Sequence, residues 1–195
     1  MKMTAFIKII TGSFLMAAAL GMVSCANNPN KNTSNTSNAG NQQHAEAALS
    51  GTFPDTTVTG TVRFDEQSGG NVRMTLQVTV PSRANKSVAV HIHEHGDCGD
   101  VGKHAGGHWN PTGANHGKWG SGSFHSGDIG NINLDASGNG RLELSSNLWS
   151  IGGDAKTDIL SKTIIVHSGV DDYTSQPAGN SGNRIGCGVI QRKSS

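Results

Sequence analysis

Histidine is concentrated in one part of this sequence, and its spacing there is typical of metal ligands. Seven of the nine histidines fall between His91 and His125, and Asp128 follows three residues later. A further histidine, His167, ends the apolar run 163–167. Neutral imidazole nitrogens with a carboxylate nearby suit copper and zinc, and packing alone would not require so many of them. The sequence therefore predicts a metal-binding protein.

Spacing divides these ligands into two groups. Residues two apart on a strand point to the same face, so His91 and His93 are predicted to project together as half of a copper site. Alone, such a pair would also fit a strand that faces solvent. The second group supplies three nitrogens and one oxygen, enough for a closed tetrahedral zinc site: His108, His116, His125 and Asp128.

The elements that would position these residues are strands. Residues 72–80 alternate between apolar and polar side chains, the pattern of a strand with one wet face. The pattern also predicts strands over 58–64, 88–93, 132–134, 142–144, 163–167 and 185–191. We find no helical repeat, so the sequence predicts an all-β fold, a sandwich or flattened barrel.

Residues from about 95 to 126 show neither a strand nor a helix pattern. A loop of this length without secondary structure is unusual in a compact domain unless something else holds it. The histidines within the loop and Cys98 are the expected ties, so a metal would order the loop as well as supply chemistry.

The N-terminal part has a different composition. Residues 1–24 combine Lys2 and Lys8 with a short apolar run and small residues at the end, which predicts a signal peptide. Cys25 would then be the lipidated first residue of a lipoprotein, although an ordinary cleaved signal with an incidental cysteine is the alternative. Residues 25–50 are rich in Asn, Gln and Ser and predict a disordered, lipid-anchored tether. Residues 51–195 form the predicted domain.

Charge and cysteine content limit the remaining possibilities. The chain has a formal net charge of +1 and no basic stripe, so no nucleic-acid partner is predicted. With Cys25 lipidated, Cys98 and Cys187 remain as a pair, and export implies a compartment in which they form a disulfide. Such a disulfide would close a loop of about 90 residues and contribute roughly 4–5 kcal/mol by the chain-entropy argument.

The motifs as a set resemble the copper–zinc superoxide dismutases over essentially all of residues 51–195. The matching segments are 90–98, 106–111, His116, 125–128, 166–173 and 184–190. Glu94-His95-Gly96 is more similar to the bacterial exported branch than to the eukaryotic cytosolic one. The resemblance implies a Greek-key β-sandwich or flattened barrel with long metal-binding loops.

The resemblance also implies roles for individual residues. Copper would be held by His91, His93, His108 and His167, and zinc by His108, His116, His125 and Asp128. Asp171 would link a copper histidine to a zinc histidine, Arg184 would dock the substrate anion, and Cys98 would pair with Cys187. The implied reaction converts superoxide to dioxygen and hydrogen peroxide through alternate reduction and oxidation of copper, with His108 and Arg184 as the catalytic residues.

Several alternatives stay open. The same fold could serve a copper-binding or copper-delivery lipoprotein, or a lipoprotein with structural zinc alone. The sequence leaves monomer and homodimer open. It predicts an exported protein, lipid-anchored at Cys25 to a bacterial membrane and facing the periplasm or the cell surface.

Residues 173–183 carry no charge, so superoxide steering is predicted to come from Lys103 or Lys118, or to be weak. The histidines outside the ligand sets are predicted to be solvated or supporting residues: His44, His95 and His104. For His95, an auxiliary contact to copper is the alternative.

Overall fold

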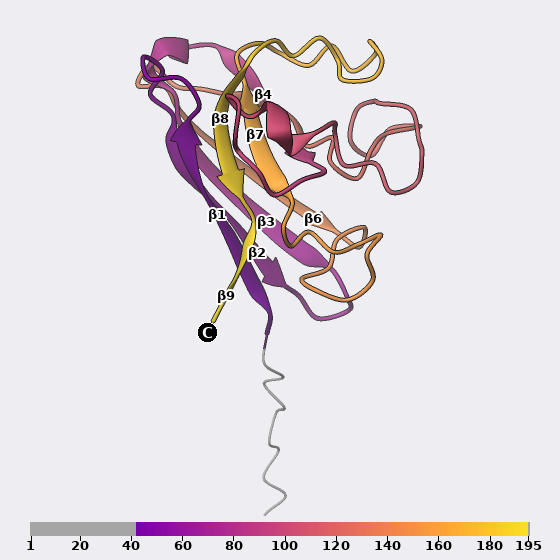
Figure 1. Ribbon diagram of the computed structural model, residues 1–195. Helices are drawn as coiled ribbons and strands as arrows, with labels where there is room; N and C mark the ends of the chain where they lie inside the picture. The colour runs from indigo at the N-terminus through magenta and orange to yellow at the C-terminus, as the bar shows by residue number, and fades with distance from the viewer. Residues whose placement is uncertain (1–41, 195) are drawn as a thin grey trace, which may run out of the picture. The chain divides into compact units, whose positions relative to one another are not determined.

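The computed structural model describes residues 42–194 (Figure 1). The predicted signal peptide 1–24, Cys25 and the first part of the predicted tether lie outside the described residues. Within residues 42–194, no helix has the length and hydropathy needed to span a bilayer.

Residues 42–194 form β-strands and two single turns of 3₁₀ helix. The strands are β1 (His44–Gly51), β2 (Thr59–Glu66), β3 (Val72–Thr79), β4 (Ser87–His93), β5 (Gly130–Asn133), β6 (Asn139–Ser146), β7 (Thr163–His167), β8 (Arg184–Val189) and β9 (Gln191–Lys193). The 3₁₀ turns are η1 (Pro81–Arg83) and η2 (Lys103–Ala105). The predicted all-β class is confirmed.

The strands form one antiparallel sheet that nearly closes into a flattened barrel (Figure 1). Its order is β5-β4-β7-β8-β1-β2-β3-β6, with β9 paired to β1, and the terminal strands β5 and β6 lie near each other. The connections from β3 to β4 and from β6 to β7 cross over to non-adjacent strands, as in a Greek key. Strands distant in sequence thereby become neighbours, which places His167 on β7 beside the histidines of β4.

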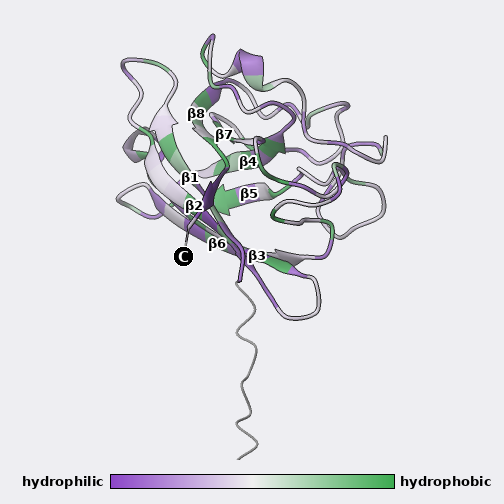
Figure 2. Ribbon diagram, turned by 60° about the horizontal axis from the view of Figure 1, so that its bottom comes forward, coloured by the Kyte–Doolittle hydropathy of each residue, from purple (hydrophilic) through white to green (hydrophobic). Residues whose placement is uncertain are grey.

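Alternating side chains build the core of the barrel. On β3, Val72, Met74 and Leu76 are buried, whereas Arg73 and Gln77 are exposed, as the period of two predicts. Figure 2 shows the hydrophobic segments on strands such as β5 and β8. On β4 both faces are buried: Val90 and Ile92 join the core, while His91 and His93 lie under the long loop that follows.

Two sequence-based boundaries were wrong. The tether predicted to reach residue 50 ends earlier, because β1 begins at His44 and pairs with β2 from His44 to Ser50. The alternating small residues Ala45 and Ala47 are fully buried against the barrel core. The last predicted strand, 185–191, is divided into β8 and β9 at Ile190.

Candidate metal centre

Four imidazoles converge beside β4. His91 and His93 project from one face of β4, His167 ends the neighbouring strand β7, and His108 reaches the group from the long loop. The ring centroids lie 3.9 Å apart for His91 and His108, 5.0 Å for His93 and His108, and 4.9 Å for His91 and His167. One ring nitrogen from each of the four lies within 4.8 Å of the others, so the structure brings all predicted copper ligands together.

Each of three rings in this group is oriented by a hydrogen bond from one nitrogen. His91 Nε2 donates to Asp171 Oδ2 at 2.9 Å, His93 Nδ1 to the Gly106 carbonyl at 3.0 Å, and His167 Nδ1 to the Gly182 carbonyl at 3.4 Å. The other nitrogens are buried and have no hydrogen-bond partner: His91 Nδ1, His93 Nε2, His108 Nε2 and His167 Nε2. Histidines that bind metals commonly use one nitrogen for the metal and the other for such a contact. The donor set therefore fits a metal ion.

Burial keeps three of these imidazoles neutral, those of His91, His93 and His167. It lowers the pKa of His91 and His93 well below the usual value, with the neighbouring His108 adding to the effect. Burial also lowers the pKa of His167 to about 3. The neutral form is the one that binds metals, so at neutral pH these three rings can bind copper without losing a proton.

The second predicted ligand group surrounds Asp128. Asp128 Oδ1 lies 2.8 Å from His108 Nδ1 and 3.2 Å from His125 Nδ1, and Oδ2 lies 3.0 Å from His116 Nδ1. One donor atom of each of the four residues lies within 4.8 Å of the others. Three nitrogens and one oxygen in a closed buried cluster fit zinc, and His108 belongs to both groups.

Main-chain groups hold the carboxylate of Asp128 in this cluster. The backbone N–H groups of His125 and Gly117 donate to Asp128 Oδ2 at 2.8 and 3.1 Å. Burial alone would raise the pKa of Asp128, but the hydrogen bonds from His108 and from these two N–H groups hold it well below its usual range. The carboxylate is therefore ionised and can serve as an oxygen ligand.

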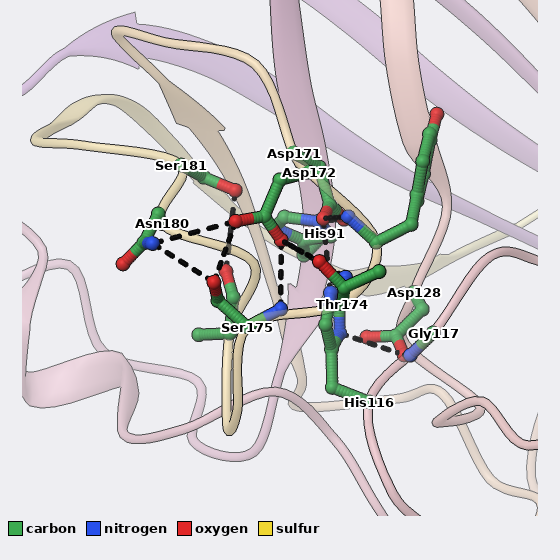
Figure 3. A network of polar contacts seen from close by, with 12 residues as sticks. His91, His116, Gly117, Asp128, Asp171, Asp172, Thr174, Ser175, Asn180 and Ser181 are labelled. Atoms are coloured by element: carbon green, nitrogen blue, oxygen red, sulfur yellow. Dashed lines mark hydrogen bonds and ion pairs between the residues drawn. The ribbon is translucent and has the colours of Figure 1, made fainter.

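Asp171 connects the two groups, as Figure 3 shows. Its Oδ2 accepts from His91 Nε2 and its Oδ1 from His116 Nε2, both at 2.9 Å. The side chains of all three residues are fully buried. These bonds place a proton on Nε2 of each ring, which leaves both Nδ1 atoms free to face a metal.

Arg184 lies at the edge of a cavity of about 780 Å³ that is also lined by His93, His108 and His167. Its Nη1 donates to the Gly102 carbonyl at 2.7 Å and its Nη2 to the Gly106 carbonyl at 2.6 Å. Burial lowers its pKa, yet arginine stays charged, and among the described residues no carboxylate lies within 4.0 Å of it. The guanidinium is thus a fixed, unpaired cation beside the imidazoles.

The predicted disulfide between Cys98 and Cys187 is confirmed. It joins the long loop to β8, three residues from Arg184. The segment from Cys98 to Gly106 supplies the carbonyls that hold Arg184, which belong to Gly102, Lys103 and Gly106. The long loop between β4 and β5 contains only the turn η2 as regular structure, so the disulfide is one of its main ties.

The remaining histidines lie outside both groups. His95 and His104 are exposed, with His95 Nε2 4.0 Å from Glu94 and His104 Nδ1 3.2 Å from Asp97. His44 is not solvated in a tether as predicted, because it lies on β1 with its Nδ1 2.6 Å from Asp65.

Sequence reasoning missed contacts that support the ligands through main-chain atoms. Gln176 binds both main-chain polar groups of His116, and Trp149 Nε1 donates to the Ser126 carbonyl at 2.9 Å. The Gly106 carbonyl serves His93 and Arg184 together. No residue type or spacing signals such contacts, since one partner in each is a main-chain N–H or carbonyl group.

Known proteins resemble this chain in sequence and in structure. Residues 58–190 match the copper/zinc superoxide dismutase family. Cu–Zn superoxide dismutase 2 of Aquifex aeolicus is 40% identical over 111 residues, covering 55% of this chain and 65% of that protein. The extracellular enzyme of Caenorhabditis elegans is 36% identical over 73% of this chain and 65% of its own length. The Podospora anserina enzyme is 36% identical over 70% of this chain and 91% of its own length.

The matched region thus spans a little under two thirds of the first two relatives and nearly all of the third. Among solved structures, the clock protein EA4 superposes with a TM-score of 0.67 at 29% identity, covering 77% of this chain and 95% of that one. Family match, fold and ligand geometry agree, and the chain belongs to the copper/zinc superoxide dismutase family.

Proposed function

We propose that this protein is a superoxide dismutase that holds copper at His91, His93, His108 and His167 and zinc at His108, His116, His125 and Asp128. The observation that carries the proposal is the pair of buried ligand groups that share His108. In the copper group each ring has one nitrogen without a protein partner. Packing gives no reason to bury several unpaired imidazole nitrogens at one point, since buried polar atoms normally have partners.

The residues around the cavity supply the rest of the chemistry. When bound, copper accepts and returns one electron, whereas zinc has no redox chemistry. Two superoxide ions and two protons give one dioxygen and one hydrogen peroxide. Arg184 offers an unpaired cation at which the small anion can dock next to the imidazoles. His108 Nε2 lies at the same cavity without a partner and can hold a proton for the peroxide product.

A copper-binding or copper-delivery protein is the alternative, since fold alone does not determine function. Such a protein needs neither an unpaired Arg184 at the cavity nor a second ligand group joined through His108. A protein with structural zinc alone would have no use for His91, His93 and His167. The geometry therefore favours the enzyme.

The decisive experiment measures copper and zinc in the purified mature domain together with superoxide consumption after copper is restored. We expect one copper and one zinc per chain and rapid turnover. His93→Ala should lose copper and activity, whereas His95→Ala, two residues further on and exposed, should keep both. Full copper occupancy without superoxide consumption would refute the enzyme and support the delivery protein.

Arg184→Ala is expected to keep both metals and to lower kcat/KM for superoxide by about 10- to 100-fold, because a hydrogen bond to a charged group contributes about 1.5–3 kcal/mol. Arg184 is not part of either ligand group, so metal content should not change. Arg141→Ala is the matched control, since Arg141 is an exposed arginine on β6 paired with Glu143. Equal rates in the two variants would remove the docking role.

The salt dependence of the rate tests how superoxide reaches the cavity. Neither lysine suggested by the sequence lines it: Lys103 Nζ lies 3.2 Å from Asp100, and Lys118 lies over the Tyr173 ring. Of the described lining residues other than histidine, only Glu94 and Arg184 are charged, and their charges have opposite signs. We expect kcat/KM to fall less than about threefold between 10 and 150 mM salt. Added salt screens charges and steeply lowers the rate only where charges steer the substrate strongly. A steeper fall would show that steering is strong.

We also propose that the protein belongs to the bacterial exported lipoprotein branch, anchored through Cys25 and facing the periplasm or the cell surface. The basic start, the apolar run and the small residues before Cys25 support this proposal. The disulfide supports an oxidising compartment. The proposal holds for a monomer and for a homodimer.

Labelling with radioactive palmitate tests the anchor. Cells that express the full chain should yield a labelled protein in the membrane fraction, and Cys25→Ser should abolish the label and release the protein. Label on the Cys25→Ser protein, or no label on the wild type, would contradict the assignment.

A further inference from the structure

The side chain of Gln176 binds both main-chain polar groups of the zinc-group histidine His116. Its Oε1 accepts a hydrogen bond from the His116 N–H at 2.9 Å, and its Nε2 donates to the His116 carbonyl at 2.9 Å. His116 lies in a stretch of turns and coil between Trp109 and Ile129, with no strand or helix to supply these partners. The amide of Gln176 therefore supplies the two main-chain hydrogen bonds that a neighbouring strand would supply to a residue in a sheet.

The segment that carries Gln176 also holds the ring of His116. Asp171 accepts from His116 Nε2, and Asp128 Oδ2 lies 3.0 Å from His116 Nδ1. Gly179 packs directly on this contact, since a Cβ at that position would lie 2.7 Å from His116 Nε2. His116 is thus fixed at its ring by Asp171 and at its backbone by Gln176.

The turn that presents Gln176 is itself well held. The Asp172 carboxylate accepts from the Ser175 N–H and hydroxyl and from Asn180 Nδ2, in the network drawn in Figure 3. None of these contacts reaches His116. Gln176 Nε2 also lies 3.3 Å from the Thr174 carbonyl, so the amide makes one contact within the turn besides its two contacts to His116. Among the described residues only Gln176 bonds to the main-chain groups of His116, so variants that loosen the turn at other positions can separate the two roles.

We propose that Gln176 is a positioning residue of the zinc site, which keeps His116 Nδ1 directed at the zinc position and thereby slows zinc release. This inference rests on the proposed zinc site. The amide is essential to the role because it donates and accepts at once, whereas a carboxylate can only accept and an ammonium can only donate.

The test uses Gln176→Met, which keeps the length of the side chain and removes the amide, in the copper-free, zinc-loaded full chain. Zinc release into excess chelator should be about 10-fold faster than in the wild type, the loss typical of residues that orient metal ligands. Gln77→Met on the exposed face of β3 is the matched control and should release zinc at the wild-type rate. The melting temperature of the metal-free protein should be the same in all three proteins.

Further variants separate the specific contact from general loop order. Asn180→Gly loosens the turn without touching His116 and suits the positive φ of 52° at that position, so it should affect zinc release far less than Gln176→Met. Gln176→Glu keeps the acceptor for the His116 N–H and should give an intermediate rate; it also serves if Gln176→Met fails to fold.

Three results would overturn the inference: wild-type release from Gln176→Met, equal acceleration in Asn180→Gly, or a matching loss of metal-free stability. A wild-type protein that binds no zinc would instead overturn the proposed function. The two failures are therefore distinguishable.

Discussion

Asp171→Asn is expected to lower zinc affinity about 100-fold while the barrel remains folded. Asp171 accepts a hydrogen bond from His91 on one oxygen and from His116 on the other, and all three side chains are fully buried. An asparagine has one acceptor oxygen, so its NH₂ group must face one of the two ring N–H groups. That ring must then turn or move its proton to Nδ1, the atom needed for the metal. Competition for zinc against a chelator of known affinity measures the change.

Asp172→Asn is the control for this prediction. Asp172 is the adjacent carboxylate and accepts hydrogen bonds from Thr174 and Ser175, but it contacts no imidazole. Its variant should keep zinc affinity within a few-fold of the wild type. If both variants lose zinc affinity equally, the affinity depends on the order of the segment between β7 and β8. The hydrogen bonds from Asp171 to the two histidines would then not be its cause.

Removing the disulfide by Cys98→Ala together with Cys187→Ala is expected to lower the free energy of unfolding by about 4 kcal/mol. The bond joins residues 89 apart in sequence, so it removes much conformational freedom from the unfolded chain. Unfolding in urea, compared between the variant and the oxidised wild type, measures the loss.

The same double variant should lose activity even where it is fully folded. The segment from Cys98 to Gly106 provides the carbonyl groups that hold Arg184, and without the disulfide this segment is tied less firmly to β8. We expect a lower kcat/KM at temperatures far below the melting point, with copper content unchanged. Full activity at low temperature would show that the disulfide serves stability alone.

The ligand residues could be predicted because their chemistry is visible in residue types. His91 and His93 share a face by the period of a strand, and the long loop had to be tied by something other than secondary structure, which the disulfide now shows. β1 could not be predicted, since Ala45 and Ala47 carry little apolar surface and follow a run of Asn and Gln. Their burial depends on pairing with β2, a long-range contact that composition does not report.

Side-chain contacts to main-chain groups are the second feature that could not be predicted from the sequence. The role of Gln176 depends on which main-chain groups lie opposite its amide, and the structure alone shows that these belong to His116. Likewise, the lysines that the sequence suggested for steering superoxide are charged and in the correct loop, but Lys103 is paired with Asp100 and does not line the cavity.

The carbonyl of Gly106 bonds to the guanidinium of Arg184 and to the ring of His93 at once. The cation proposed to dock the anion and a proposed copper ligand therefore share one acceptor oxygen, while the other guanidinium nitrogen of Arg184 bonds to the Gly102 carbonyl. His93 lies on β4 and Arg184 on β8, so a loss of order at Gly106 would disturb the docking of the anion and the orientation of a proposed copper ligand together.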